Sequence, residues 1–234
     1  CAMKCAFCMT GTLGLSRNLE AYEIVEQFLY LEEIAGKLDN IVFMGMGEPM
    51  DNLEAVLGAL EILTAPWGFA WSPKRITVSS IGVIPNLKVL LDRTKVHIAI
   101  SLHNPFPLQR MELMPMEKAW PIEKVLALLR QYDFTGQRRV SFEYTIFSGM
   151  NDSKAHADAL VRLLRGLECR VNLIRFHAIP DSPLKTASLS AMEIFRDRVS
   201  AGGITATIRA SRGEDIFAAC GLLSGEHRNN GNDS

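Results

Sequence analysis

Short apolar runs alternate with segments of helical periodicity along this 234-residue chain, and this alternation limits the fold more than any other feature. The apolar runs predict strands at 41–44, 76–79, 96–102, 140–146, 171–176 and 204–209. Helical spacing predicts helices at 20–37, 53–63, 87–92, 122–132, 156–167, 191–199 and 215–223. Strands separated by helices favour a parallel sheet with crossover helices, so we expect an α/β fold.

Prolines and a polar tail interrupt the alternation. Pro105, Pro107 and Pro115 predict a loop after the third strand, because proline lacks a backbone N–H and restricts the residue before it. We expect one domain over 1–223, followed by a disordered tail at 224–234, where residues are mostly small or polar. Sites in parallel sheets of this kind gather at the carboxyl ends of the strands, so we expect the functional residues there.

Three of the five cysteines lie within the first eight residues, as Cys1, Cys5 and Cys8. Four-iron clusters normally take four cysteine thiolates, so a loop with three would leave one iron open to a ligand. Zinc sites usually add a second cysteine pair or histidines, whereas Cys169 and Cys220 stand apart. The spacing therefore favours an iron–sulfur cluster in an enzyme over a zinc-bound interaction module.

The overall composition excludes several classes of protein. The chain has no run of about 18 apolar residues and no basic segment before an apolar one, so neither a membrane span nor a signal peptide is predicted. We expect a cytoplasmic protein, because clustered cysteines fit a reducing compartment. A net charge of −1 argues against a strongly electrostatic nucleic-acid binder. The start at Cys1 suggests a piece of a longer protein.

A glycine-rich stretch, Gly45-Met46-Gly47-Glu48-Pro49, follows the first predicted strand. It is not a dinucleotide-binding fingerprint, because the third glycine of that motif is missing. Small residues let a ligand approach the backbone closely, and Glu48 could accept hydrogen bonds from a cationic amino group. A strand end with a solvated Glu48 is the alternative.

The motifs taken in order resemble the RlmN/Cfr family of RNA adenine methyltransferases, which are radical S-adenosylmethionine (SAM) enzymes, and the RlmN branch is closer. The resemblance rests on the cysteine array, Thr10-Gly11, the stretch 44–49, Ser101-Leu102-His103, 171–174 and 213–221. It implies a partial (β/α)6 radical-SAM barrel whose first strand is missing, with a [4Fe-4S] cluster on Cys1, Cys5 and Cys8. The implied SAM contacts are Gly47, Glu48, Ser79, Ser101, Leu102, His103 and His177, the last at a position where the family usually has asparagine.

The resemblance also implies a catalytic role for Cys220. In the family this cysteine is first methylated by one SAM, and a radical from a second SAM then activates the methyl group for transfer. We expect methylation of C2 of an adenosine in 23S rRNA, with tRNA as a second substrate of the kind that family members use. A Cfr-like C8 methyltransferase and a radical-SAM activase, which would not need Cys220, are the alternatives.

The expected partners follow from the same resemblance. They are 23S rRNA, tRNA and a reducing electron donor of flavodoxin type, with no membrane contact and a monomeric state. The family's second catalytic cysteine lies upstream of the cluster loop, so we do not expect the chain as printed to complete a full turnover.

Overall fold

A computed structural model describes residues 1–136, 138–179 and 182–210 of the chain. Cys220, the predicted helix at 215–223 and the predicted tail at 224–234 lie outside the described residues. No helix within these ranges combines the length and the apolar character that crossing a bilayer requires.

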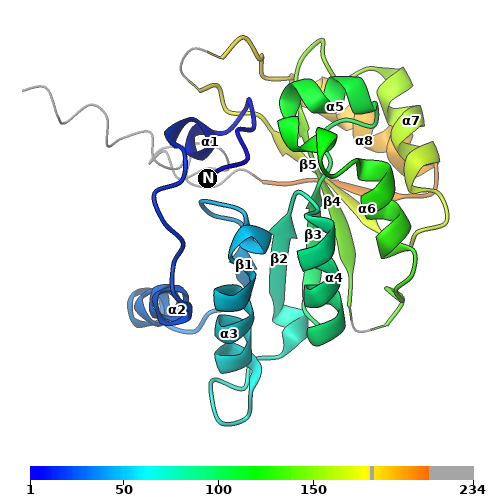
Figure 1. Ribbon diagram of the computed structural model, residues 1–234. Helices are drawn as coiled ribbons and strands as arrows, with labels where there is room; N and C mark the ends of the chain where they lie inside the picture. Colours follow the sequence, from blue (N-terminus) through cyan, green and yellow to red (C-terminus); the bar gives the residue numbers. More distant parts are fainter. Residues whose placement is uncertain (137, 180–181, 211–234) are drawn as a thin grey trace, which may run out of the picture.

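The described strands form one parallel sheet in the order β1-β2-β3-β4-β5-β6. The sheet curves into a partial barrel that stays open between β1 and β6, which confirms the predicted fold class (Figure 1). The strands are β1 (Ile41–Phe43), β2 (Ile76–Ser80), β3 (His97–Ser101), β4 (Val140–Ile146), β5 (Arg170–Arg175) and β6 (Thr205–Ile208).

Helices connect the strands and cover the outer face of the sheet (Figure 1). The α-helices are α1 (Met9–Leu13), α2 (Ala21–Ala35), α3 (Leu53–Thr64), α4 (Ile84–Arg93), α5 (Pro107–Leu113), α6 (Ile122–Leu129), α7 (Lys154–Leu164) and α8 (Leu189–Ala201). Three short 3₁₀ helices are η1 (Pro49–Asn52), η2 (Pro73–Arg75) and η3 (Pro115–Lys118).

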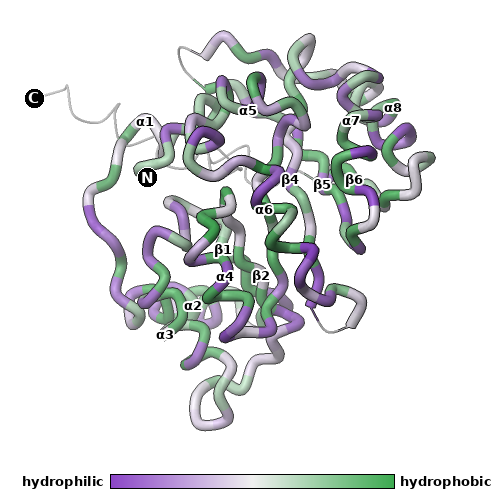
Figure 2. The backbone as a smooth tube through the Cα atoms, turned by 45° about the vertical axis from the view of Figure 1, so that its right-hand side comes forward, coloured by the Kyte–Doolittle hydropathy of each residue, from purple (hydrophilic) through white to green (hydrophobic). Residues whose placement is uncertain are grey.

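The core lies between the sheet and these helices. On β4, Phe142, Tyr144 and Ile146 are fully buried, because alternate residues of a strand point to the same face. The Tyr144 ring packs against Phe195 of α8, with ring centroids 5.1 Å apart. Figure 2 shows β1 and α3 as largely hydrophobic segments, as expected of elements that contribute to this core.

The predicted loop around Pro105 to Pro115 is wrong in part. Pro107 begins α5 and Pro115 begins η3. Proline suits the first position of a helix, where the missing N–H has no carbonyl to bind and the fixed φ already matches. Two of the three prolines predicted to lie in a loop are therefore helix starts, whereas Pro105 lies in a bend before α5.

Candidate active site at the carboxyl ends of the strands

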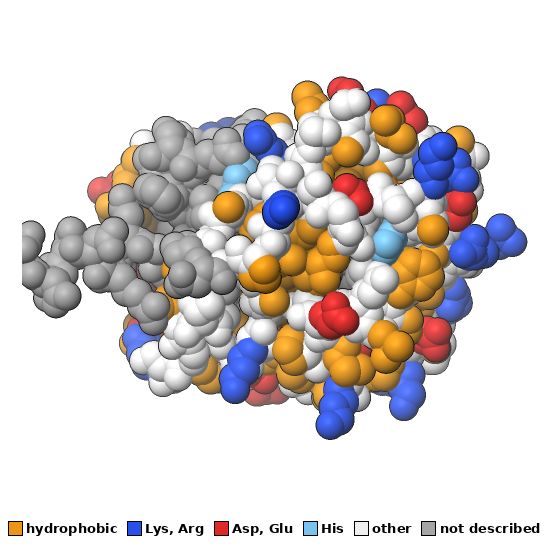
Figure 3. All heavy atoms as spheres, turned by 90° about the horizontal axis from the view of Figure 1, so that it is seen from above, with side chains coloured by type: hydrophobic (Ala, Val, Ile, Leu, Met, Phe, Trp, Pro, Cys, Tyr) orange, Lys and Arg blue, Asp and Glu red, His pale blue; other side chains and the backbone are white. Residues whose placement is uncertain are grey.

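A cavity opens at the carboxyl ends of the strands, beneath the N-terminal loop that carries the three cysteines. Figure 3 looks onto this end of the molecule, where hydrophobic, acidic and basic side chains are interspersed. The structure brings eight of the predicted site residues to this one cavity, namely Cys1, Cys5, Cys8, Gly47, Glu48, Ser79, Ser101 and His103. Parallel strands place their carboxyl ends on one edge, which explains why residues so far apart in sequence meet here.

The cysteine loop is held against the barrel by its own backbone. Cys1, Cys5 and Cys8 are free thiols and each is partly buried. The Cys8 N–H donates to the Cys5 carbonyl at 3.2 Å, which makes a tight turn, and the Ala6 N–H donates to the carbonyl of Leu113 at the end of α5 at 2.9 Å. The three thiols are thereby presented to the cavity from one short segment.

The donor set fits an iron–sulfur cluster. Cysteine thiolates are the usual ligands of such clusters, and three cysteines of one short loop line the same cavity. Burial, together with the nearby charges of Cys8 and Glu48, raises the pKa of Cys5 to about 12. A coordinated metal reverses such a shift, because it deprotonates the thiol.

Phe7, the aromatic residue before Cys8, joins the cysteine loop to the end of β3. Its ring meets the His103 ring edge-on, with centroids 4.7 Å apart and planes at 61°. The Phe7 ring also packs against Phe147, and the centroids of these two rings are 5.6 Å apart. This aromatic contact fixes the height of the loop above His103.

His103 is a buried, neutral histidine. It has a left-handed φ of 57°, and the amide of Asn151 donates to its carbonyl at 2.7 Å. The Thr145 N–H donates to His103 Nδ1 at 3.0 Å, which leaves the proton of the neutral ring on Nε2. Burial and, to a smaller extent, the charge of Arg110 together lower the pKa of His103 to about 3. His103 can therefore offer the cavity one N–H donor.

Glu48 is buried, so the alternative prediction of a solvated glutamate at a strand end is wrong. Its Oε1 accepts the Met50 N–H at 3.1 Å and its Oε2 accepts the Ile81 N–H at 2.9 Å. Burial raises the pKa of Glu48 to about 7, although these hydrogen bonds act in the opposite direction. Both oxygens thus hold η1 to the end of β2. Each oxygen has a further lone pair, so a ligand amine could still bind.

The remaining predicted contacts differ in how much they offer a ligand. Ser79 and Ser101 are partly exposed and line the cavity. Leu102 is completely buried, and its backbone N–H donates to the Glu143 carbonyl at 3.0 Å. His177 is partly buried and does not line the cavity.

A buried ion pair holds the loop 101–103 in place. Arg110 of α5 and Glu117 of η3 are both buried and form this pair. Arg110 also donates to the Leu102 carbonyl at 2.9 Å and to the Ser101 carbonyl at 2.8 Å. The position of two predicted contact residues therefore depends on a cation that the sequence did not single out.

Glu143, Thr145 and Arg209 also line the cavity, and none of them was predicted. Glu143 and Thr145 are buried polar residues on β4, and Arg209 follows β6. Polar residues at every second position of β4, beginning at Ser141, were the available signal. They mark a face of the strand that points away from the apolar core and into the barrel.

Comparison with known proteins identifies relatives of this arrangement. The profile of the radical SAM superfamily matches residues 1–160. A probable dual-specificity RNA methyltransferase RlmN of Parabacteroides distasonis is 58% identical over 224 residues, which are 96% of this chain and 65% of that protein. The dual-specificity RNA methyltransferase RlmN of Syntrophus aciditrophicus is 43% identical and spans 97% of this chain and 66% of its own length. The chain thus spans about two thirds of the length of these relatives.

Solved structures share the fold. A radical SAM methyltransferase from Sphaerobacter thermophilus superposes with a TM-score of 0.91 and 43% identity, covering 97% of this chain and 68% of its own. Streptococcus suis SuiB, solved with bound S-adenosylmethionine, has a TM-score of 0.65 at 16% identity over 93% of this chain and 49% of its own, a likeness of fold alone.

Proposed function

Because the chain belongs to the radical SAM superfamily, we propose that it is the catalytic core of an RNA methyltransferase that uses a [4Fe-4S] cluster and SAM. The target we propose is C2 of an adenosine in 23S rRNA, with tRNA as a second substrate. The RNA substrate is supported by relatives named as dual-specificity RNA methyltransferases. The observation that carries the proposal is the single cavity in which the three cysteines meet the glycine-rich stretch and the 101–103 loop.

The residues of this chain would divide the work as follows. Cys1, Cys5 and Cys8 hold the cluster, and SAM bound beside it supplies both the methyl carbon and the radical that starts the transfer. Gly47 has a φ of 101°, a backbone conformation that residues with a side chain rarely adopt. Because glycine has no side chain, it leaves room for a ligand at the end of β1. His103 donates a hydrogen bond from Nε2.

Cys220 is proposed as the residue that carries the methyl group before its transfer. The motif 213–221 supports this role by resemblance, and it lies outside the described residues. An adenine ring carbon between two nitrogens is electrophilic and is no nucleophile for ordinary methyl transfer, so a carrier thiol and a radical route suit this target.

The test is mass spectrometry of nucleosides from 23S rRNA and tRNA of cells that depend on the full-length gene. We expect 2-methyladenosine with the wild-type gene and none with Cys220→Ala. Detection of 8-methyladenosine would favour the Cfr-like reaction instead. Full activity of the Cys220→Ala protein would exclude a methyl-carrying cysteine at this position and favour an activase.

Glu48 provides a second test, on SAM binding. Glu48→Ala should weaken SAM binding by about ten- to hundred-fold, because a charge-assisted hydrogen bond to the ligand amine is worth roughly 1.5–3 kcal/mol. The [4Fe-4S] absorbance should persist. Equilibrium dialysis measures the dissociation constant, and Glu61→Ala on the exposed face of α3 is the matched control. An unchanged dissociation constant would leave Glu48 with only its role of joining η1 to β2.

A further inference from the structure

One oxygen of a buried carboxylate in the cavity has no hydrogen-bond partner among the described residues. Glu143 lies in the middle of β4 and is 4% exposed. Its Oε1 accepts from Ser141 Oγ at 3.1 Å and from Asn172 Nδ2 at 2.8 Å. Its Oε2 is buried and accepts no hydrogen bond from any residue that the structure describes. Buried acceptors are nearly always satisfied, so an unsatisfied one in a cavity wall requires an explanation.

The side chain is held in this orientation by its neighbours. Thr207 of β6 donates to Asn172 Oδ1 at 3.1 Å, which leaves the Asn172 amide nitrogen to donate to Glu143. Glu143, Asn172 and Thr207 occupy matching positions on three adjacent strands. This polar row fixes Oε1, so the remaining oxygen is presented to the cavity rather than free to rotate away.

Arg209 does not supply the missing hydrogen bond. Its Nη1 lies 3.9 Å from Glu143 Oε2, which is beyond hydrogen-bond distance, and the same nitrogen contacts the sulfur of Met44 at 3.3 Å. The guanidinium is close enough to oppose the effect of burial, which raises the pKa of Glu143. The cavity therefore contains a carboxylate oxygen with a cation nearby and a vacant acceptor position.

The chemistry of Glu143 Oε2 limits which ligand groups can bind it. An ionised carboxylate only accepts hydrogen bonds, so the group that completes it must be an O–H or N–H donor. A phosphate is disfavoured by like charge. Both substrates of the proposed reaction contain adenosine, which offers such donors in its ribose hydroxyls and its exocyclic amino group.

We propose that Glu143 Oε2 accepts a hydrogen bond from a hydroxyl or amino group of an adenosine bound in this cavity. This inference rests on the proposed function. Glu143 would then contact the ligand directly and favour adenosine because adenosine offers an uncharged hydrogen-bond donor. Ser141, Asn172 and Thr207 are the residues that position the Glu143 side chain.

The experiment compares Glu143→Gln with wild type in the full-length protein. Glutamine has nearly the same volume as glutamate, and its amide oxygen can still accept from Ser141 and Asn172. Its amide NH₂ then takes the place of Oε2 and cannot accept a hydrogen bond from the ligand. We expect the affinity for adenosine-containing ligand to fall by about ten- to hundred-fold. Calorimetric titration with SAM and, separately, with a substrate RNA hairpin distinguishes the two sources of adenosine. Glu61→Gln, on the exposed face of α3, is the control and should bind as wild type does.

Ligand analogues identify the donor without relying on the variant alone. SAM is tested with the 2′-hydroxyl, the 3′-hydroxyl or the 6-amino group of its adenosine removed in turn. The hairpin is tested with the 2′-hydroxyl or the 6-amino group of the target adenosine removed, because its 3′-oxygen belongs to the phosphodiester backbone. The analogue that lacks the true donor should bind weakly to wild type and equally weakly to Glu143→Gln, since the two losses are not additive for groups in contact. If no deletion weakens binding to wild type, the proposal is wrong.

The outcomes separate this inference from the function on which it rests. Wild-type protein that binds neither SAM nor RNA contradicts the proposed function and this inference with it. Wild-type protein that binds both, beside a Glu143→Gln protein that binds both equally well, contradicts only the inference. Thermal unfolding of the variant shows whether it is folded, and the analogue series on wild type decides the question if it is not.

Discussion

At the scale of single residues, His103 combines burial with a fixed tautomer. We expect its imidazole to stay neutral and protonated on Nε2 from about pH 8 to about pH 4, because burial and Arg110 lower its pKa to about 3. Nitrogen-15 NMR of histidine-labelled protein reports the tautomer directly. An ordinary histidine has a pKa of 6.5, so the stability contributed by neutral His103 is present above pH 6.5 and is lost as the pH falls toward 3. A titration midpoint near 6.5 in the native protein would contradict the structure.

The same scale shows what the sequence can and cannot predict about a site. Cys1, Cys5 and Cys8 were predictable because metal-ligand spacing is local, and Ser101 and His103 because they lie at the carboxyl end of a predicted strand. Glu143 was not, because its significance depends on Asn172, a residue 29 positions away that engages one oxygen and leaves the other without a partner. Glu48 was identified as a site residue, but its bond to the Ile81 N–H is a tertiary contact with no trace in the local sequence.

At the scale of elements, the Arg110–Glu117 pair joins α5 and η3 beneath the 101–103 loop. Glu117→Gln should destabilise the fold by about 3–5 kcal/mol, because it leaves the Arg110 charge buried without a counterion. Urea unfolding measures this loss. Hydrogen exchange at 101–104 should accelerate as well, since Arg110 donates to the carbonyls of Ser101 and Leu102.

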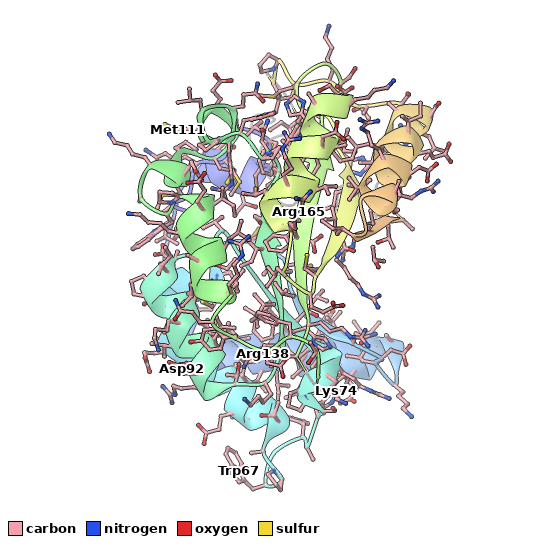
Figure 4. The ribbon with its side chains drawn as sticks, turned by 90° about the vertical axis from the view of Figure 1, so that its right-hand side faces the viewer. Trp67, Lys74, Asp92, Met111, Arg138 and Arg165 are labelled. Carbon is pink, nitrogen blue, oxygen red and sulfur yellow. The ribbon has the colours of Figure 1, made fainter. Side chains whose placement is uncertain are left out.

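An exposed ion pair supplies the control for this prediction. Lys88 and Asp92 are four residues apart on α4, and both side chains are about half exposed. Figure 4 shows Asp92 at the end of the molecule opposite to Met111 of α5. Lys88→Ala should change the unfolding free energy by less than about 1 kcal/mol. Equal losses for Lys88→Ala and Glu117→Gln would show that burial does not set the strength of these pairs.

The helices predicted best are those with an apolar periodicity over several turns and a regular N-terminal cap. The helix expected at 156–167 is α7, which begins after Ser153, whose side chain accepts the His156 N–H. The helix α5 was missed because its seven residues begin at Pro107 and carry too few apolar positions to show a period. Short elements of this kind depend on tertiary partners, here the ion pair of Arg110.

At the scale of the whole molecule, the sheet is an open barrel whose two edges are joined by a contact beside the cavity. Arg209, after β6, contacts Met44, after β1, although 165 positions separate them. Strand and helix alternation predicted the parallel sheet, but it carries no information about how far the sheet curves. That curvature determines whether Arg209 and Glu143 face the same cavity as the cysteines, so this part of the site could not be derived from the sequence.

Helix α2 stands beside α3 at the edge of the molecule, outside the sheet (Figure 1). Its two buried side chains are Val25 and Phe28, and the Phe28 ring packs edge-on against Phe69 and Trp71, with centroids 5.0 and 5.6 Å away. Segments with few buried apolar contacts open independently of the core. We therefore expect Phe28→Ala to lower the opening free energy of α2 amides by up to about 3–5 kcal/mol, the usual cost of such a truncation.

Native-state hydrogen exchange tests whether α2 opens as a separate unit. Amides of β3, β4 and β5 should keep their wild-type protection in Phe28→Ala, because their strands are paired on both sides and do not depend on the Phe28 ring. Leu29→Ala, which truncates the neighbouring side chain where it is 45% exposed, should leave α2 nearly as protected as in wild type. A uniform loss of protection across α2 and the central strands would instead show that the helix and the sheet unfold as one cooperative unit, and the aromatic contact at Phe28 would then support the whole barrel rather than its edge.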